Sequence, residues 1–225
     1  MSNPARPPSP GASVRRILEL KRQGTRIVAM SAYDAVFGAL LEEAGVDLIL
    51  VGDSVGTACL GYSSTLPVTM DEMVHHARAV KRGAPHSLVV LDMPFMTYQV
   101  SVEEALRNAG RALQEAGVEA VKVEGGHERT CRAIEALVTT GIPVMGHVGL
   151  TPQSVHALGG YRVQGREAAE ADRLRAEARA LEDAGVFSLV LELAPAPLAK
   201  EITASLTIPT IGIGAGPWCD GQVLV

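Results

Sequence analysis

Four acidic side chains stand at the ends of short apolar runs, the places where buried strands would bring them to a surface. The runs end at Asp53, Asp92, Glu124 and Glu192, and the clearest of them is LVVLD at residues 88–92. Parallel strands that are covered on both faces read as continuous apolar runs rather than as alternation. In barrels and open α/β sheets the carboxyl ends of such strands carry the active site. The pattern therefore predicts that these four carboxylates gather at one end of a parallel sheet.

Three of these carboxylates, Asp53, Asp92 and Glu124, end consecutive strands. Neighbouring strands lie about 4.8 Å apart, so the three acids would repel one another unless a positive group lay between them. That group could be a divalent metal ion or Lys122, which shares a strand face with Glu124. A ligand set made only of oxygen favours Mg²⁺ or Mn²⁺ over zinc. The alternative is that each acid caps the next helix, but three acids on adjacent strands beside a lysine favour a functional site.

Two further candidates end strands on the other side of the expected sheet. Glu192 follows an apolar run and is the candidate general base; its alternative role is to cap the helix after Pro195. His147 lies in the sequence GHVG at the end of a strand. It is either a core histidine bonded to the backbone or a substrate contact.

The elements that must position these residues alternate along the chain. Strands are expected near residues 26–33, 48–53, 87–92, 120–124, 143–148, 189–192 and 209–213. Helices are expected at 14–23, 34–43, 69–82, 101–115, 128–138, 168–184 and over about ten residues from 197. Two loops, 56–67 and 151–166, are too long for plain connections, and long loops after strands are often functional.

This alternation predicts an α/β fold with right-handed crossovers throughout. The expected architecture is a (β/α)₈ TIM barrel, with a doubly wound open sheet as the second choice. Only seven strands can be identified. Residues 222–225 are interpreted as part of the helix that should follow the seventh strand. A C-terminal strand and helix are therefore expected to be missing. We expect residues 1–12, rich in proline, to be a disordered tail and residues 13–225 to be one barrel domain, truncated at its C-terminus.

Composition excludes several classes of protein. The 225 residues are 47% hydrophobic with a net charge of −5, which fits a large core and argues against a nucleic-acid binder. No apolar run approaches the roughly 20 residues of a membrane span, so no membrane association is expected. The N-terminus lacks an apolar signal core, which predicts a cytoplasmic protein. Cys59, Cys131 and Cys219 are odd in number and scattered, as in a protein with reduced thiols.

Seven ordered stretches resemble the ketopantoate hydroxymethyltransferase (3-methyl-2-oxobutanoate hydroxymethyltransferase) family, and the resemblance as a whole runs from about residue 13 to the last residue. They include three of the four acidic strand ends, Asp53, Asp92 and Glu124, and parts of both long loops. The stretches are Val51–Ser54, Ser64–Thr69, Leu91–Met96, Val121–Gly126, Gly146–Gln153, Gly160–Arg166 and Ile211–Gly216.

The resemblance implies a barrel of the phosphoenolpyruvate/pyruvate superfamily. It also implies transfer of a hydroxymethyl group from 5,10-methylenetetrahydrofolate to 3-methyl-2-oxobutanoate, which gives 2-dehydropantoate in the first committed step toward pantothenate and coenzyme A. A large homo-oligomer, typically a decamer, would be expected. The chain departs from the family in lacking its usual C-terminal segment.

Residue by residue, the resemblance implies a Mg²⁺ site at Asp53, Asp92 and Glu124. Asp53 and Asp92, together with Ser54 and Lys122, would contact the substrate, and Glu192 would accept a proton. His147 is a possible additional contact. Two other readings stay open. One is a lyase or mutase of the same superfamily that cleaves a C–C or P–C bond without folate, and the other is a barrel that no longer catalyses a reaction.

Overall fold

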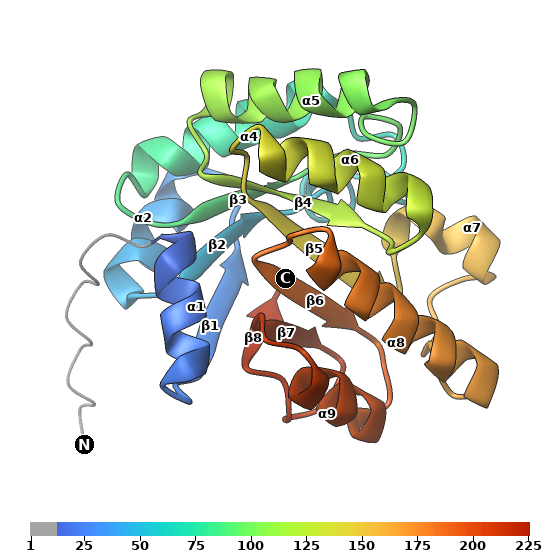
Figure 1. Ribbon diagram of the computed structural model, residues 1–225. Coiled ribbons are helices and arrows are strands. Elements are labelled where there is room, and N and C mark those ends of the chain that lie inside the picture. Colours follow the sequence, from blue (N-terminus) through green and yellow to red (C-terminus); the bar gives the residue numbers. More distant parts are fainter. Residues whose placement is uncertain (1–12) are drawn as a thin grey trace.

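A closed ring of eight parallel strands forms the centre of the computed structural model, which describes residues 13–225 (Figure 1). Each strand pairs with the next in chain order, and β8 pairs with β1. The predicted (β/α)₈ barrel is confirmed and the open sheet is excluded; the expected tail at 1–12 lies outside the described residues. The strands are β1 (Ile27–Ser31), β2 (Leu48–Val51), β3 (Val89–Asp92), β4 (Ala120–Glu124), β5 (Val144–Gly149), β6 (Ser188–Glu192), β7 (Thr210–Ile213) and β8 (Gly221–Leu224).

The eighth strand was expected to be missing, and the structure shows that this expectation is wrong. β8 occupies residues that were assigned to the helix expected after the seventh strand. Ile27 pairs with Gly221 to close the ring. Residues 214–220, which join β7 to β8, form no helix. Burial alternates along β8, with Val223 buried and Leu224 exposed. This strand therefore lacks the continuous apolar run by which the other strands were recognised.

Helices surround the ring on the outside (Figure 1). Several begin at the predicted caps: the Thr69 hydroxyl accepts from the Glu72 N–H while the Glu72 carboxylate accepts from the Thr69 N–H, a complete capping box. A π-helical turn, η1 (Ala112–Ala116), continues α5. The helices are α1 (Val14–Arg22), α2 (Ala35–Ala44), α4 (Met70–Gly83), α5 (Val102–Arg111), α6 (Glu128–Thr139), α8 (Ala168–Asp183) and α9 (Ala196–Ser205).

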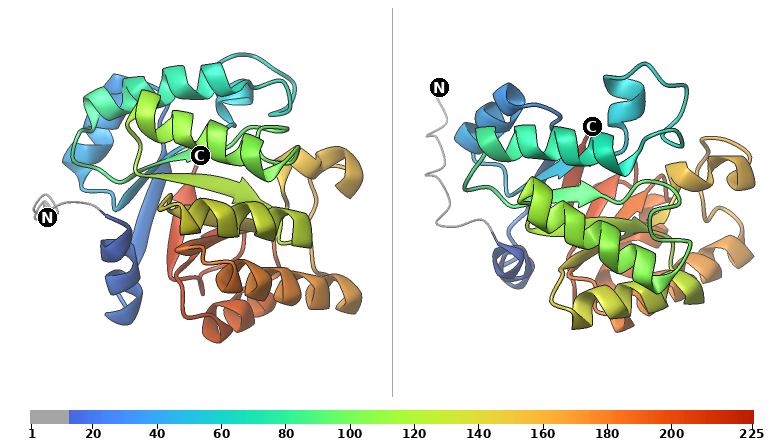
Figure 2. Two further views of the ribbon diagram at one scale, coloured as in Figure 1. Left: turned by 45° about the horizontal axis from the view of Figure 1, so that its top comes forward. Right: turned by 90° about the horizontal axis from the view of Figure 1, so that it is seen from above.

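The two long loops lie at the end of the barrel toward which the strand arrows point, as Figure 2 shows. The first contains the short helix α3 (Val55–Ala58), and the second contains η2 (Pro152–Ser154) and α7 (Val155–Leu158). Both therefore border the carboxyl ends of the strands, which is where barrel enzymes place their active sites.

The core has two parts. Between the strands and the outer helices lies a large apolar cluster that includes Met73, Ile134 and Leu181. A second cluster fills the inside of the barrel, where Leu48 and Leu88 pack with Leu20 of α1. The barrel is thus a packed body rather than a pore, and polar side chains enter its interior at the carboxyl end. No helix in residues 13–225 is both long and apolar enough to cross a membrane.

Candidate active site

All the predicted site residues line one cavity of about 200 Å³ at the carboxyl ends of the strands. Asp92, Glu124 and Glu192 are the last residues of β3, β4 and β6, while Asp53 lies two residues beyond β2. The residues brought together are Asp53, Ser54, Asp92, Lys122, Glu124, His147 and Glu192. The sequence pattern therefore located the place in the fold where these side chains meet.

Lys122 lies among the carboxylates, with its Nζ 3.2 Å from Asp92 Oδ1 and 3.1 Å from His147 Nδ1. Lys122 as a whole is only 6% exposed. Burial alone would lower the pKa of Lys122, but Asp92, Glu124 and Asp53 outweigh it and raise that pKa above its usual value. The side chain is therefore a fixed ammonium ion within the cavity.

The neighbouring acids Asp53 and Asp92 contact each other directly, because the Asp53 N–H donates to Asp92 Oδ2 at 3.1 Å. Burial, followed by the charges of Asp92 and Glu124, raises the pKa of Asp53 to about 7. Burial also raises the pKa of Asp92, although Lys122 opposes the shift. One ammonium thus offsets only part of the negative charge, and a further cation at this position would stabilise the ionised pair.

Asp53 and Asp92 fit a magnesium ion better than Glu124 does. Glu124 is already engaged, since its Oε2 accepts from the Gln153 N–H at 3.1 Å and its Oε1 lies 3.5 Å from His147 Nδ1. In contrast, Asp92 Oδ1 has no partner in hydrogen-bonding geometry, despite its ion-pair distance to Lys122. Within residues 13–225, no three His, Cys, Asp or Glu side chains are grouped closely enough to hold a metal ion. Two carboxylates are sufficient for Mg²⁺, which commonly keeps several waters or substrate oxygens as its other ligands.

His147 connects Lys122 to Glu192 across the cavity. Its Nε2 lies 3.2 Å from Glu192 Oε2, and its position opposite Glu124 is set by the pairing of β4 with β5. Burial and Lys122 act to lower the pKa of His147, but Glu124 and Glu192 outweigh them and raise it. Among the described contacts, the polar neighbours of its ring are the side chains of Lys122, Glu124 and Glu192 rather than backbone groups.

A glycine brings β5 close to Glu192. Gly149 pairs with Glu192 and has a φ of 100°. A Cβ at this glycine would lie 2.1 Å from the Glu192 carbonyl oxygen. Any other residue would force the two strands apart and move the Glu192 carboxylate relative to His147.

Gln153 was not singled out in the sequence, yet it joins two of the acids. Its Nε2 donates to Asp53 Oδ2 and to the Met93 carbonyl, both at 2.9 Å, while its N–H binds Glu124. Its Oε1 accepts from the Tyr98 hydroxyl at 2.8 Å. A glutamine does not by itself indicate a functional site in a sequence. The only indication for Gln153 was its position after GHVGLTP in a long loop. Ser54, a predicted substrate contact, forms a hydrogen bond with the Tyr33 hydroxyl, with 2.8 Å between the two oxygens.

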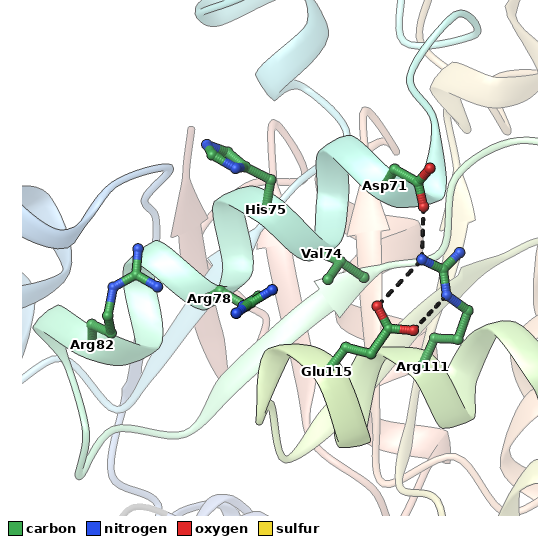
Figure 3. A pocket seen from close by; sticks show the side chains of 7 residues that line it. All are labelled: Asp71, Val74, His75, Arg78, Arg82, Arg111 and Glu115. Atoms are coloured by element: carbon green, nitrogen blue, oxygen red, sulfur yellow. Dashed lines mark hydrogen bonds and ion pairs between the residues drawn. The ribbon is translucent and has the colours of Figure 1, made fainter.

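A larger cavity of about 430 Å³ lies outside the barrel, between α4 and the α5–η1 segment. Figure 3 shows Arg111 there between Asp71 and Glu115, with Nη2 2.7 Å from Asp71 Oδ1 and Nε 2.7 Å from Glu115 Oε1. The acids of this groove are thus neutralised locally, and it contains none of the predicted site residues. The cavity at the strand ends is the candidate active site.

Solved structures with the same fold include enzymes that act on small carboxylic acids. One is 2,3-dimethylmalate lyase, described as a member of the PEP mutase/isocitrate lyase superfamily, with a TM-score of 0.70 and 18% identity over 96% of this chain and 79% of that one. Another is phosphonopyruvate hydrolase in complex with oxalate and Mg²⁺, with a TM-score of 0.71 and 14% identity over 93% and 79%. At these identities the likeness concerns the fold alone, a (β/α)₈ barrel.

Sequence relatives are much more similar. The 3-methyl-2-oxobutanoate hydroxymethyltransferase of Acaryochloris marina is 58% identical over 95% of this chain and 82% of its own length. The protein of the same name from Heliobacterium modesticaldum is 59% identical over 92% and 75%. Residues 12–225 match the model of the family described as ketopantoate hydroxymethyltransferase. The chain therefore belongs to the ketopantoate hydroxymethyltransferase family.

Proposed function

We propose that this protein is a 3-methyl-2-oxobutanoate hydroxymethyltransferase. It would transfer a hydroxymethyl group from 5,10-methylenetetrahydrofolate to 3-methyl-2-oxobutanoate and release 2-dehydropantoate, the first committed intermediate of pantothenate and coenzyme A biosynthesis. The names of relatives such as the Acaryochloris marina enzyme support this activity. The folate co-substrate is carried over from the family resemblance, and the chemistry of the cavity supports the metal and the residue roles.

One observation carries the proposal: a single small cavity holds a cationic group on one side and a carboxylate base on the other. Lys122 and the Asp53–Asp92 pair form the first side, and Glu192 forms the second. Abstraction of a proton next to a ketone needs both features, because a base must take the proton while positive charge stabilises the growing enolate oxygen. The lysine and the two strand-end acids thus suit a 2-oxo acid substrate.

In this proposal Glu192 removes the proton from C3 of the keto acid. His147 Nε2 lies 3.2 Å from Glu192 Oε2 and is the polar neighbour of this carboxylate. Lys122 keeps its ammonium charge next to the oxygen that becomes negative, and Ser54, fixed by Tyr33, orients the substrate. Water adds to the methylene carbon of the folate and frees it from the folate nitrogens as formaldehyde. The enolate carbon attacks that carbon, its oxygen takes up a proton to become the hydroxyl group, and 2-dehydropantoate and tetrahydrofolate are released.

Magnesium fits the site through Asp53 and Asp92, since Asp92 Oδ1 accepts no hydrogen bond and has only the ion-pair contact with Lys122. When bound there, Mg²⁺ would supply Lewis-acid stabilisation of the enolate. Glu124 would stabilise the site without binding the ion, because its carboxylate already accepts from the Gln153 N–H and contacts His147. Mg²⁺ held by two carboxylates retains positions for oxygens of the substrate.

Assembly and location are carried over from the family resemblance. We expect a homo-oligomer, a decamer in its usual form, acting in the cytoplasm on small molecules. Sedimentation velocity of the purified protein measures the assembly, and a monomer under assay conditions would contradict this expectation.

The activity is tested by assaying turnover of 3-methyl-2-oxobutanoate with and without 5,10-methylenetetrahydrofolate, each in the presence of Mg²⁺ or EDTA. The proposal expects product only with folate and metal together. Cleavage of a C–C or P–C substrate without folate would instead indicate a lyase or mutase. Failure to convert any substrate by a folded protein would indicate a barrel without catalysis.

A further inference from the structure

The central cavity is too small for the whole of the proposed co-substrate. Its volume is about 200 Å³, which suits a branched keto acid of eight heavy atoms with its metal. Sites for ligands of drug size typically span about 300–1,000 Å³, and a reduced folate with its glutamate tail belongs to that class. If the one-carbon unit reaches the keto acid, most of the folate must lie in a second cavity that opens onto the first.

Two neighbouring cavities share a lining residue with the central one. The first, of about 350 Å³, shares only Glu124. Glu124 and Gln153 are 6% and 7% exposed and are hydrogen-bonded to each other, so they form a closed wall between the two spaces. A folate in that cavity would need this wall to open.

The second neighbour, of about 560 Å³, shares Tyr161, a residue that is 60% exposed. Tyr161 lies in the loop between β5 and α8 and lines the cavity at the carboxyl ends of the strands. The two cavities therefore meet at Tyr161.

The chemistry of the second cavity matches the outer part of a folate. Arg162 and Arg166 line it, and among the described residues neither side chain forms a hydrogen bond or an ion pair. Of its two acids, Glu170 is already engaged by the Gly165 N–H at 3.1 Å. The loop is anchored to the barrel, since the Gln164 N–H donates to the Leu193 carbonyl at 2.8 Å. The two arginines are thus held on a fixed segment with their guanidinium groups available.

We propose that the segment 161–166 binds the p-aminobenzoyl-glutamate part of the folate co-substrate. Tyr161 packs against the aminobenzoyl ring, and Arg162 and Arg166 bind the glutamate carboxylates, a pairing that the planar guanidinium group favours. The pterin and its one-carbon unit then lie at the mouth of the central cavity. This inference rests on the proposed function and adds to it the location and the chemistry of the folate site.

The test compares Arg162→Ala/Arg166→Ala with the parent enzyme, using mono- and triglutamyl 5,10-methylenetetrahydrofolate. Loss of charged hydrogen bonds should raise the KM for folate about 10-fold or more, and more for the triglutamate than for the monoglutamate. The KM for the keto acid should stay within about twofold, because its cavity is lined by other residues. A variant with Arg162→Ala and Arg166→Lys should recover part of the loss, since lysine restores one charge but not the planar fork.

Arg173→Ala is the matched control, because Arg173 is the arginine of the cavity behind Glu124. Its KM for folate should equal that of the parent. An Arg173→Ala enzyme with a raised folate KM, beside an unaffected double variant, would place the folate behind Glu124 and overturn the inference. A double variant with the parent's folate KM would overturn it as well.

Direct binding separates this inference from the proposed function. Calorimetry with triglutamyl tetrahydrofolate needs no turnover and should show affinity lost in the double variant and kept in Arg173→Ala. Binding that depends on Arg162 and Arg166 in a parent without transferase activity would refute the function and leave the site standing. Transferase activity in the parent, with folate binding that does not depend on Arg162 and Arg166, would support the function and refute the proposed site.

Discussion

At the scale of the residue, the charge balance around Lys122 decides what the site can do. Its ammonium contacts Asp92 and His147 within a cavity that also contains Asp53 and Glu124. The pKa of Asp53 is raised while that of Glu124 is lowered, because His147, Lys122 and Gln153 stabilise the Glu124 carboxylate against the cost of its burial. Neighbouring acids are therefore prepared for different roles by their immediate partners.

Glu192→Gln tests the base. The variant is nearly isosteric but cannot accept a proton, so exchange of the C3 proton of 3-methyl-2-oxobutanoate in D₂O should slow by about 10²–10⁴-fold. Proton NMR follows this exchange without folate, and the affinities for substrate and Mg²⁺ should change far less. Glu43→Gln, an exposed change on α2, is the control. Exchange within a few-fold of the parent would eliminate Glu192 as the base and make His147 the next residue to test.

Asp92→Asn tests the metal site. Asparagine keeps the shape and the acceptor for the Asp53 N–H but removes the charge, so calorimetry should show weaker Mg²⁺ binding with the fold intact. Asp34→Asn removes the same charge at the exposed N-cap of α2, where asparagine caps equally well. It should bind Mg²⁺ like the parent. Equal affinity in Asp92→Asn would remove Asp92 from the set of ligands.

The raised pKa of Asp53 predicts a pH dependence of stability in the metal-free protein. The folded state, with an Asp53 pKa of about 7 against the usual 3.8, binds more protons than the unfolded chain between these values. The free energy of unfolding should therefore fall as pH rises from about 4 to about 7 and then level off. Urea unfolding in EDTA should show this loss in the parent relative to Asp53→Asn. A difference between the two proteins that is independent of pH would refute the shift.

The site residues differ in how well a sequence can reveal them. Asp92 and Glu124 were located because a charged residue rarely ends a buried apolar run unless it faces a surface or a ligand. Gln153 could not be identified in the same way, since its importance comes from hydrogen bonds to Asp53 and Tyr98, which are distant in sequence. Tyr161 stood within a motif, but its position between two cavities exists only in the folded chain.

At the scale of the element, the approach of α2 to α4 depends on one glycine. A Cβ at Gly83, the last residue of α4, would lie 2.0 Å from the carbonyl oxygen of Ala35, the first residue of α2. Backbone atoms occupy that space, so no side-chain rotation could accommodate the methyl group. The two helices can therefore pack at this distance only without a side chain at position 83.

Gly83→Ala should lower the free energy of unfolding by about 1–3 kcal/mol, because it forces α2 away from α4. Gly110→Ala is the matched control: its Cβ meets nothing within 4 Å near the end of α5. That change should raise stability by about 0.5–1 kcal/mol through the better helix propensity of alanine. Urea denaturation measures both, and changes of the same sign would contradict the packing argument.

Among the elements, most of the helices and strands were predictable because their apolar patterns are regular and their caps are explicit, as at Thr69. The short helices within the loops were not, since four residues carry no periodicity. β8 was missed because a helix was expected before it, whereas only residues 214–220 separate it from β7. Its pairing with β1 is a property of the closed ring rather than of the local sequence.

At the scale of the whole molecule, a single ammonium joins the beginning of the barrel to its end. Lys21 of α1 donates to the Thr203 and Ile208 carbonyls at 3.2 and 2.9 Å and to Asp220 Oδ2 at 3.0 Å. Asp220 also accepts from the Thr210 N–H at 2.8 Å. Helix α1 is thereby fixed to the end of α9 and to the turn that leads into β8.

Lys21→Met keeps the apolar stem but removes three hydrogen bonds, so it should lower the free energy of unfolding by about 1–3 kcal/mol. Arg15→Met is the control, because the Arg15 side chain is 89% exposed and pairs only with Glu19 among the described residues. Its effect should be close to zero. Thermal unfolding of the two variants and the parent checks this, and equal midpoints would show that Lys21 contributes nothing to closure.

The pairing of β1 with β8 has a consequence for the synthesis of the protein. β1 leaves the ribosome among the first strands, but Ile27 finds its partner only after Gly221 has been translated. Until then β1 and β7 both present unpaired backbone edges, which invite association with other nascent chains. Val223 of the closing strand also lines the central cavity. The candidate active site is thus completed by the same event that removes the exposed edges, after translation has passed the eighth strand.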